Sequence, residues 1–457
     1  MSVTEQAEVV VVGLGVAGEA VGGALARAGL DVVGIEENLV GGECPYWGCI
    51  PSKMMIRAGN LLAEARRAPG MAGDATVTPD WAPVARRIRE EATADWDDTA
   101  AVDRFTDAGG RFVRGRAEIL GPDRVRVGDT EYVASRGLVV ATGTEPVVPP
   151  IDGLAGTPFW TNRGAIEAEE LPASLIVLGG GAIGLEIAQA YARFGVEVTV
   201  VEAAERLLPM DEPESSELVT DVLAREGLTV HAGSPVTRVA YEDGGGFVVT
   251  ADGVSGELRA ERLLVATGRR PRLTPETRAA LGAAPRGELV DDRLRIADRV
   301  WAIGDVAGKG AFTHVATYHA DIVTREVLGQ EGPAADHHAL PRVTFTDPEV
   351  GAVGLTESAA REAGLTVATG IQRASSTTRG WIHKAGGDGF VKLVADAEAG
   401  HLVGATAAGP YGGEVLGMLA LAVHARVPLT TLESMIYAYP TFHRGILEAL
   451  KDLRSAG

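Results

Sequence analysis

The sequence predicts an α/β protein with two β-α-β domains of related design, followed by an α+β domain. Three observations support this prediction. A glycine-rich turn between an apolar strand and a helix occurs twice, and an apolar strand ending in Ala-Thr-Gly also occurs twice. From about His337 onward, strand and helix patterns alternate without such turns. With 457 residues the chain is too long for one hydrophobic core, so several domains are expected.

The first glycine-rich turn follows the segment 8–12. In this short segment four β-branched valines follow Glu8, as in a buried parallel strand. The chain continues as Gly13-Leu14-Gly15-Val16-Ala17-Gly18, then a helix, then a second apolar strand ending at Glu36. In such a turn the first glycine permits the tight bend, the second admits a pyrophosphate, and the third allows close helix packing. The segment therefore predicts a Rossmann-like dinucleotide site.

The second copy starts from the apolar segment 175–178. It continues as Gly179-Gly180-Gly181-Ala182-Ile183-Gly184, and its second strand ends at Glu202. In both copies the acidic residue lies 23 positions after the first glycine. One such motif is weak evidence, but two in full β-α-β context predict two dinucleotides, each with its pyrophosphate on a helix N-terminus.

The two acidic residues bear on the choice of nucleotide. Glu36 and Glu202 can each accept hydrogen bonds from ribose hydroxyls. Because the Glu202 carboxylate would repel a 2′-phosphate, we expect NAD(H) to be preferred over NADP(H). Arg206 lies close in sequence and leaves the alternative open.

The paired Ala-Thr-Gly strands, 139–143 and 264–268, suggest that one nucleotide domain is nested within the sequence of the other. We predict a first nucleotide domain over 1–149 and 269–336 and a second over 150–268. The first would include the strand 301–305, and a third domain would cover 337–457.

Charge and composition exclude several classes of protein. A net charge of −20 argues against nucleic acid or an anionic membrane as partner. No apolar run is long enough for a membrane span, and the acidic residues before residue 9 do not suit a secretion signal. Two cysteines alone cannot complete a zinc site, so no metal cofactor is expected. We expect a cytoplasmic protein.

The two cysteines, Cys44 and Cys49, are five positions apart. In a cytosolic protein such a pair favours redox chemistry over a structural disulfide. Across a helical turn they could reach the short separation that a disulfide needs. If Cys44 opens a helix, the helix dipole would stabilise a thiolate there, and Lys53 adds positive charge nearby.

Together with the segment 346–351 (Thr-Asp-Pro-Glu-Val-Gly), these motifs make the whole chain resemble the flavoprotein disulfide reductases. That family includes dihydrolipoamide dehydrogenase, glutathione reductase and mercuric reductase. The resemblance implies FAD in the first domain, a pyridine nucleotide in the second, and a homodimer formed by the third. Electrons would pass from NAD(P)H through FAD to the cysteine pair, and then to a small-molecule or protein disulfide.

The resemblance also implies roles for individual residues. Cys49 would lie against the flavin as the charge-transfer thiolate, while Cys44 would attack the substrate disulfide. Lys53 would lie by the flavin, paired with Glu186. Asp305 would lie at the ribityl chain of FAD, and Gly115 and Ala117 near its adenine. The full set of further cofactor positions is Gly42, Gly115, Ala117, Thr142, Gly143, Gly268, Gly304 and Asp305. Tyr46 and Trp47, between the cysteines, would pack the flavin edge or shape a substrate pocket.

One segment departs from the family pattern. The family's acid/base motif His-Pro-Thr-x-x-Glu is here Tyr439-Pro440-Thr441-Phe442-His443-Arg444. Tyrosine, with an ordinary pKa near 10, is a poor base at neutral pH. In a helix His443 would share the face of Tyr439, but if Pro440 opens the helix, Tyr439 lies outside it. His443 is either a substitute acid/base or a surface or interface histidine.

Two functions therefore stay open. One is reduction of a disulfide, and the alternative is reduction of a non-dithiol acceptor such as a quinone or a metal ion. The intact cysteines and nucleotide motifs argue against a non-catalytic redox sensor, and the end of the chain, 452–457, lacks the cysteine pair of mercuric reductases. The histidine pairs at 314 with 319 and at 337–338 are expected to be loop or flavin-side packing residues in preference to metal ligands.

Overall fold

The computed structural model describes residues 3–242 and 244–455. The chain divides into two compact units. Unit 1 comprises Met1–Pro51, Arg87–Val147 and Arg269–His337, and unit 2 comprises Ser52–Arg86, Val148–Gly268 and His338–Gly457. The division falls inside helix α3 (Cys49–Arg67). The division into three domains stays a prediction.

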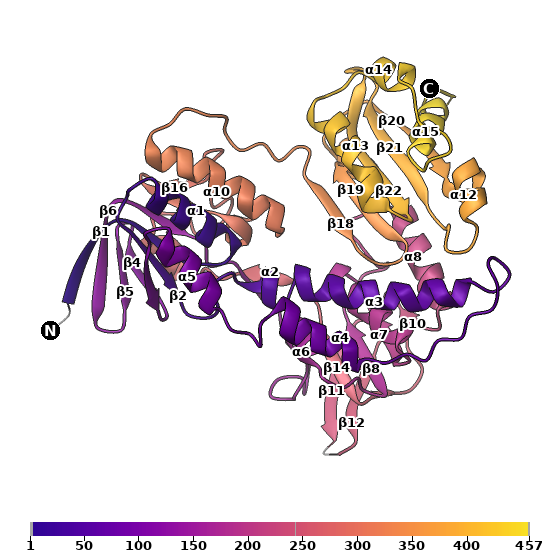
Figure 1. The fold of residues 1–457 in the computed structure, drawn as a ribbon, viewed down its shortest axis with the longest axis horizontal. Helices are drawn as coiled ribbons and strands as arrows, with labels where there is room; N and C mark the ends of the chain where they lie inside the picture. The colour runs from indigo at the N-terminus through magenta and orange to yellow at the C-terminus, as the bar shows by residue number, and fades with distance from the viewer. Residues whose placement is uncertain (1–2, 243, 456–457) are drawn as a thin grey trace. The chain divides into compact units, whose positions relative to one another are not determined.

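Unit 1 is built on an eight-stranded sheet with the order β16-β17-β6-β1-β2-β3, extended from β6 by β5 and β4 (Figure 1). Strands β3, β2, β1, β6 and β17 run parallel to one another, whereas β16 and β5 pair antiparallel with β17 and β6. The strands are β1 (Val3–Val12), β2 (Val32–Glu36), β3 (Arg111–Arg114), β4 (Glu118–Gly121), β5 (Arg124–Val127), β6 (Thr130–Val140), β16 (Arg295–Ala297) and β17 (Val300–Ala302). A separate ribbon pairs β7 (Thr144–Pro146) with β15 (Arg269–Pro271).

The order of strands in unit 1 places a ligand crevice. Strand β1 lies between β2 and β6, so the chain leaves it in opposite directions on its two sides. In open parallel sheets such a reversal marks the crevice at the carboxyl ends of the strands. The helices of unit 1 are α1 (Val16–Arg27), α2 (Glu43–Tyr46), η1 (Ile88–Ala92), α5 (Thr99–Asp107), α9 (Pro275–Ala280), η2 (Gly304–Ala307) and α10 (Thr313–Leu328).

Unit 2 repeats this design in a four-stranded parallel sheet with the order β10-β9-β8-β14. Strand β8 lies between β9 and β14, as β1 lies between β2 and β6. The elements of this part are α4 (Ala82–Arg87), α6 (Asn162–Glu167), β8 (Ser174–Leu178), α7 (Ala182–Arg193), β9 (Glu197–Val201), α8 (Pro213–Arg225), β10 (Thr229–His231) and β14 (Arg262–Val265). An antiparallel sheet of β11 (Val236–Glu242), β12 (Gly246–Ala251) and β13 (Leu258–Ala260) adjoins it.

The C-terminal part of unit 2 is a five-stranded antiparallel sheet with the order β18-β19-β22-β21-β20. Helices α13 and α15 pack on it and share its apolar core. The elements are β18 (Pro341–Thr344), β19 (Glu349–Gly354), α11 (Glu357–Glu362), β20 (Val367–Arg373), η3 (Ala374–Ser376), α12 (Thr378–His383), β21 (Phe390–Asp396), β22 (His401–Gly409), α13 (Gly412–His424), α14 (Leu429–Ser434) and α15 (Arg444–Ser455).

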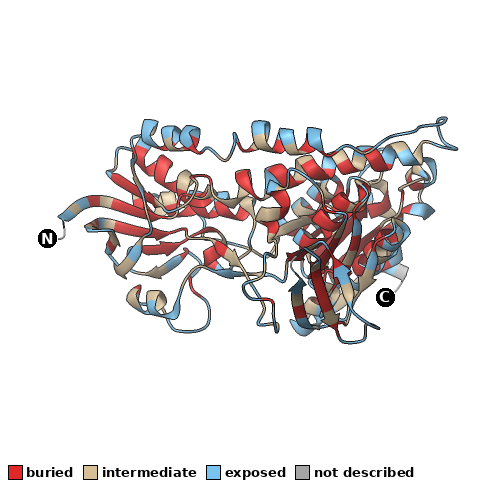
Figure 2. Cartoon of the chain, turned by 90° about the horizontal axis from the view of Figure 1, so that it is seen from below, coloured by how far each residue is buried: buried red, intermediate tan, exposed pale blue. Residues whose placement is uncertain are grey.

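One buried apolar core lies in unit 1, a second is shared by the four-stranded and three-stranded sheets, and a third belongs to the five-stranded sheet. Many of the strands are coloured as buried (Figure 2). The four valines of the predicted strand 8–12, residues 9–12, are at most 4% exposed, as a parallel strand covered on both faces requires. No helix within residues 3–242 and 244–455 combines the length and apolar character that crossing a bilayer requires. The predicted α/β architecture with an α+β C-terminal part is therefore present.

A buried ion cluster in unit 2 involves Lys392 of β21. Its side chain is 6% exposed, and Nζ lies 2.8–3.0 Å from carboxylate oxygens of Glu212, Glu214 and Glu357. Burial alone would lower the pKa of Lys392, but the hydrogen bonds to the three glutamates raise it overall. The cluster therefore joins three segments of unit 2 through one lysine.

Candidate functional site

The first glycine of each glycine-rich turn is required by a neighbouring strand end. Gly13 has φ 92° and Gly179 has φ 110°, a region that side chains other than hydrogen disfavour. A Cβ at Gly13 would overlap the carbonyl oxygen of Ala141, and a Cβ at Gly179 would overlap that of Ala266. In each unit, the Ala-Thr-Gly strand end therefore lies directly against the glycine-rich turn.

The remaining glycines of these motifs have two roles, which are close helix packing and open space for a bound group. A Cβ at Gly18 would overlap the carbonyl oxygen of Gly13, and at Gly184 it would contact Gly179 in the same way, so both third glycines permit close helix packing. At Gly181 a Cβ would find no heavy atom within 4 Å. This open space beside a helix N-terminus fits the pyrophosphate of a dinucleotide.

In unit 1 the predicted residue Gly42 closes against the second glycine of the turn. A Cβ at Gly42 would lie 2.8 Å from the Cα of Gly15, so only bare backbone fits there. Gly15 is the N-cap residue of α1, in extended conformation. The two glycines form a cradle of backbone at the helix N-terminus, and this cradle fits the pyrophosphate of FAD.

The two acidic residues hold the glycine-rich turns in matching ways. Glu36 accepts hydrogen bonds from the backbone N–H of Leu14 (2.8 Å) and from the N–H two residues after itself (2.7 Å). Glu202 accepts from the N–H of Gly180 (2.5 Å) and likewise from the N–H two residues on (2.6 Å). The internal duplication therefore extends to the hydrogen bonds of the acidic side chains.

Arg206, which left the nucleotide preference open, is committed to the backbone. Its guanidinium donates to the carbonyl oxygens of Leu208 (3.0 Å), Pro209 (2.9 Å) and Asp211 (2.7 Å). Release of this side chain toward a phosphate would break three hydrogen bonds.

Asp305, expected at the ribityl chain, lies in the short helix η2. Its carboxylate accepts a hydrogen bond from the hydroxyl of Thr144 (3.0 Å), which in turn accepts one from Arg269 Nε (2.8 Å). Burial raises the pKa of Asp305, while Thr144 and the charge of Arg269 oppose that rise. The side chain is therefore held in place by residues that follow the two Ala-Thr-Gly strands.

Other predicted cofactor residues follow the carboxyl ends of β3 and β6 in unit 1 and of β14 in unit 2. Thr142 donates to the carbonyl of Arg272 (3.1 Å). A Cβ at Gly143 or at Gly268 would find no heavy atom within 4 Å. Gly115 donates its N–H to the carbonyl of Glu36 (2.9 Å), and Ala117 is partly buried against the core. The residues present fit FAD in unit 1 and a pyridine nucleotide in unit 2.

Both cysteines are thiols in the structure, and they lie in different helices. Cys44 is the second residue of the four-residue helix α2, which ends before Trp47, and Cys49 is the first residue of α3. The expectation that the two cysteines meet across one helical turn was wrong, because the chain leaves the helical region at Trp47 (φ −138°). Tyr46 and Trp47 are themselves buried, with ring centroids 5.8 Å apart.

The electrostatics of the pair also differ from the expectation for Cys44. Its side-chain hydrogen bond with Cys49 and its burial raise the pKa of Cys44. The N-terminus of a 19-residue helix lies at Cys49 instead, where its dipole favours a thiolate. In the reduced pair, the raised pKa therefore favours the protonated form of Cys44.

A hydroxyl that the sequence analysis missed contacts the pair. Thr313 Oγ1 lies 3.3 Å from Cys49 Sγ, and Thr313 is the first residue of the 16-residue helix α10. A hydroxyl side chain at the start of a helix is a local signal for a polar contact. Nothing in the spacing of the sequence connects it with a cysteine 264 positions away.

The predicted pairing of Lys53 with Glu186 is present in unit 2. Lys53 Nζ lies 2.8 Å from Glu186 Oε2, and the glutamate is 6% exposed. The other carboxylate oxygen accepts the backbone N–H of Phe345 (2.8 Å), and Lys53 Nζ also lies 4.5 Å from the centroid of the Phe345 ring. The pair is well held, and its place beside the flavin stays a prediction.

The segment that replaces the acid/base motif lies outside the helix that follows it. Helix α15 begins at Arg444, so Pro440 does not open it. Tyr439 and His443 both precede this helix and therefore do not share a helical face, which was one of the two arrangements considered from the sequence. Tyr439 is 65% exposed, and its hydroxyl donates to Thr378 Oγ1 (3.2 Å). The guanidinium of Arg444 lies over the Tyr439 ring, 5.5 Å from its centroid.

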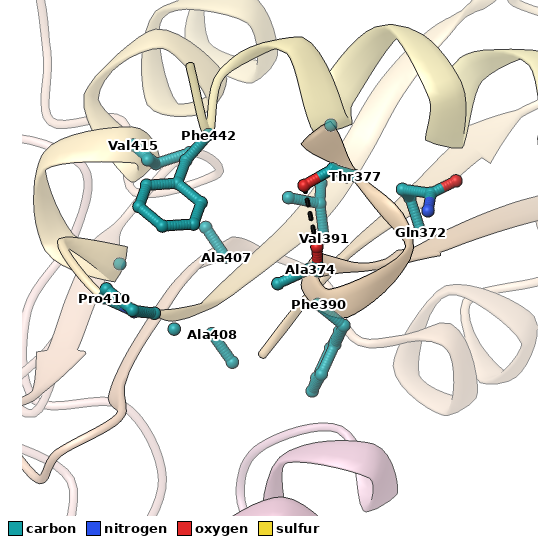
Figure 3. A pocket seen from close by; sticks show the side chains of 13 residues that line it. Gln372, Ala374, Thr377, Phe390, Val391, Ala407, Ala408, Pro410, Val415 and Phe442 are labelled. Carbon is teal, nitrogen blue, oxygen red and sulfur yellow. Dashed lines mark hydrogen bonds between the residues drawn. The ribbon is translucent and has the colours of Figure 1, made fainter. Parts of the chain in front are cut away.

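A hollow of about 350 Å³, counting its open mouth, lies between the five-stranded sheet and the helices on it. The ring of Phe442 points into this hollow, and Thr377 Oγ1 donates to the carbonyl of Ala374 (2.7 Å) at its side (Figure 3). Its walls carry no charged side chain and consist of Gln372, Ala374, Thr377, Phe390, Val391, Ala407, Ala408, Gly409, Pro410, Gly412, Val415, Phe442 and Gly445. The hollow offers apolar contact and no acid or base.

Two family models cover nearly the whole chain. Residues 7–320 match the pyridine nucleotide-disulphide oxidoreductase model, and residues 340–450 match the dimerisation domain of the same family. A dihydrolipoyl dehydrogenase of Haloferax volcanii is 34% identical over 97% of this chain and 96% of its own length. A mercuric reductase of Shigella flexneri is 33% identical over 96% of this chain and 79% of its own length.

A solved structure agrees with these relatives. The Cu(II) complex of the HOCl-induced flavoprotein disulfide reductase RclA from Escherichia coli superimposes with a TM-score of 0.84 at 26% identity. The match covers 98% of this chain and 99% of the other. With the glycine cradles, the cysteine pair and both family models in agreement, the chain belongs to the pyridine nucleotide-disulphide oxidoreductases and is an enzyme of that flavoprotein family.

Proposed function

We propose that this enzyme passes electrons from NADH, through FAD and the Cys44–Cys49 pair, to a disulfide substrate, as a dihydrolipoyl dehydrogenase-like oxidoreductase. The observation that carries the proposal is the arrangement of the two thiols. They hydrogen-bond each other, and Cys49 lies at the N-termini of two helices, its own α3 and α10 through Thr313. Such a site stabilises one thiolate and keeps the second sulfur in reach.

The proposed reaction balances as two thiol exchanges. Bound FAD would supply the transfer of an electron pair from the hydride of NADH to the Cys44–Cys49 disulfide. Cys44, once deprotonated, attacks the substrate disulfide, forms a mixed disulfide and releases one substrate thiolate. Cys49 then attacks the Cys44 sulfur, releases the second thiolate and restores the internal disulfide. The two released thiolates take up two protons, one supplied by the solvent and one carried by Cys44 before its attack.

The test is an anaerobic titration of the flavin-loaded enzyme with NADH while its visible spectrum is recorded. Uptake of two electrons should produce a long-wavelength charge-transfer band, because the Cys49 thiolate would then lie against oxidised flavin. Bleaching of the flavin without that band would mean that the cysteine pair is disengaged and would overturn the proposal.

A second candidate function has its own observation. The raised pKa of Cys44 makes its attack on a disulfide dependent on a base. The family's histidine is replaced by Tyr439, whose hydroxyl is engaged with Thr378. A metal ion accepts electrons without protons, and reduction of a quinone by the flavin does not require a thiol to be deprotonated first. Related proteins include mercuric reductases and a flavoprotein solved with Cu(II). Reduction of such a non-dithiol acceptor is therefore the alternative.

The two candidates are separated by removing the thiols. A variant with both Cys44→Ser and Cys49→Ser should lose reduction of any disulfide substrate but still bind FAD. If it reduces quinones or metal ions at the wild-type rate, those acceptors take electrons directly from the flavin, and the first candidate is overturned as the main activity. If it loses both activities, the cysteine pair carries the electrons in each case.

NADH is proposed as the preferred electron donor. Support comes from the Glu202 carboxylate at the glycine-rich turn of unit 2, and from Arg206, whose guanidinium is bound to three backbone carbonyls. A 2′-phosphate would meet a negative charge, and Arg206 would have to leave its three carbonyls to compensate it.

The enzyme is further proposed to be a cytoplasmic homodimer. A cytoplasmic location suits a cysteine pair that cycles between thiol and disulfide. Dimerisation is supported by the family's dimerisation domain and by large apolar side chains exposed on it, among them Ile436 (96% exposed) and Trp381 (75%). Light scattering coupled to size-exclusion chromatography would give twice the 47.5 kDa chain mass for the dimer, and the chain mass itself would contradict it.

A further inference from the structure

A pair of histidines in unit 1 is not used by the proposed electron path. His319, in α10, is fully buried, and its Nδ1 accepts the backbone N–H of Gly304 (3.2 Å). Its Nε2 lies 2.8 Å from Nε2 of His337, and the two rings meet edge to face with centroids 5.1 Å apart. A chain of two hydrogen bonds therefore joins Gly304 to His337.

The directions of these two bonds follow from the chemistry of imidazole. Because Nδ1 of His319 accepts from Gly304, neutral His319 carries its proton on Nε2. That proton is donated to His337, whose Nε2 must then be unprotonated. A proton added to His337 would set two N–H groups against each other, and a proton added to His319 at Nδ1 would face the N–H of Gly304. Either protonation removes one of the two bonds.

The turn held by this pair is the one that carries Asp305. Gly304 opens η2 with φ 69°, and a Cβ there would lie 3.3 Å from the side chain of Ala17 in α1. Its N–H is buried, so without an acceptor it would be an unsatisfied donor. The Asp305 carboxylate is held on its other side by Thr144. His319 thus supports the backbone of the turn, and Thr144 supports its side chain.

His337 lies at the last position of unit 1, where the chain leaves for the five-stranded sheet. Tyr318 of α10 holds this end of the unit through two contacts. The His337 ring meets the Tyr318 ring edge to face, and the backbone N–H of the neighbouring Asp336 donates to the Tyr318 hydroxyl (2.9 Å). The pair therefore connects the FAD-side turn with the end of this unit.

We propose that His319 is a positioning residue for the Gly304–Asp305 turn, and that protonation of the His319–His337 pair releases the turn and weakens retention of FAD in acid. This inference rests on the proposed function, in which FAD carries the electrons, and on the predicted position of Asp305 at the ribityl chain of FAD. It assigns a role to two histidines that do not touch the reacting sulfurs.

The charged groups around His319 and His337 set the pH range over which this pair gains a proton. Burial, with the neighbouring His337 and Lys309, lowers the pKa of His319 to about 4. Burial and Lys309 also lower the pKa of His337, while Asp336 opposes this. Lys309 is itself paired with Glu288 (2.7 Å). Since both folded-state pKa values are depressed, the pair supports the turn fully above the ordinary histidine pKa of about 6.5 and loses that support as the pH falls toward about 4.

The experiment measures FAD retention against pH from 7.5 to 4 in the flavin-loaded dimer, using flavin fluorescence in the ultrafiltrate. In His337→Gln, the amide oxygen can accept from His319 but does not titrate, so FAD release should move to lower pH than in the wild type. In His337→Phe, the buried N–H of His319 has no acceptor, so FAD should be held about tenfold more weakly even at pH 7.5. Thermal unfolding at pH 7.5 shows whether each variant is folded, and if His337→Phe is not, His337→Gln alone decides.

Three coincident release curves, or a His337→Gln curve that does not move to lower pH, would overturn the positioning role while leaving the proposed electron path intact. A wild-type protein that holds no FAD at pH 7.5 would instead overturn the proposed function and this inference together. The two failures are thus distinguishable in one series of measurements.

Discussion

Replacement of Thr313 by Val tests whether the hydroxyl at the start of α10 sets the charge on Cys49. The two side chains are 3.3 Å apart, and valine keeps the shape of threonine while removing the hydroxyl. A hydrogen bond to the charged form of a thiol favours that form. Loss of this bond should therefore raise the pKa of the Cys49 thiol in the reduced enzyme.

The size of the effect follows from the contact and its exposure. Hydrogen bonds to charged groups contribute roughly 1.5–3 kcal/mol when they are well shielded. Cys49 is exposed in the chain, so water can replace part of the lost bond. We therefore expect about 1 kcal/mol, equivalent to roughly a fivefold fall in the ratio of thiolate to thiol at a given pH.

The assay follows the charge-transfer band after anaerobic reduction with one equivalent of NADH, between pH 5 and pH 9. Because the thiolate becomes harder to form, the pH at which half of the band is lost should move upward in Thr313→Val. Thr313→Ser keeps the hydroxyl and should follow the wild type. If all three proteins lose the band at the same pH, the hydroxyl does not stabilise the thiolate and the reasoning is wrong.

Three further changes test other parts of the structure. Glu202→Ala should reduce the ratio of kcat/KM for NADH to that for NADPH by about fivefold, because it removes one repulsive charge worth about 1 kcal/mol. If this ratio does not change, Glu202 does not exclude the 2′-phosphate. Glu186→Gln should lower the free energy of unfolding by about 2 kcal/mol, because Lys53 loses its counter-ion. Glu186→Ala should lower it further, because the N–H of Phe345 also loses its acceptor. Denaturant titrations that reverse this order would contradict the assignment. Lys392→Met should lower the free energy of unfolding by about 2 kcal/mol at pH 7, because the three facing carboxylates lose their shared counter-ion. An unchanged denaturant midpoint would rule this out.

Local sequence patterns determined much of the fold and the outline of the site. The duplicated glycine-rich turns, and the acidic residue that ends the second strand of each copy, occupy equivalent positions in the two units. These features could be predicted because each depends on backbone geometry within a single β-α-β segment. The first glycine is needed where the tight turn of this motif lies against a neighbouring strand end, and the spacing to the acidic residue is the length of one helix and one strand.

The tertiary structure decided the contacts between segments that are distant in the sequence. It placed Thr313 on Cys49, joined His319 to Gly304 and His337, and turned Arg206 onto backbone carbonyls. It also separated the two cysteines into different helices, although their spacing suited a single one. Periodicity and motif spacing describe only short-range backbone geometry, whereas the choice of hydrogen-bond partner depends on which buried groups the packed sheets and helices leave to be satisfied.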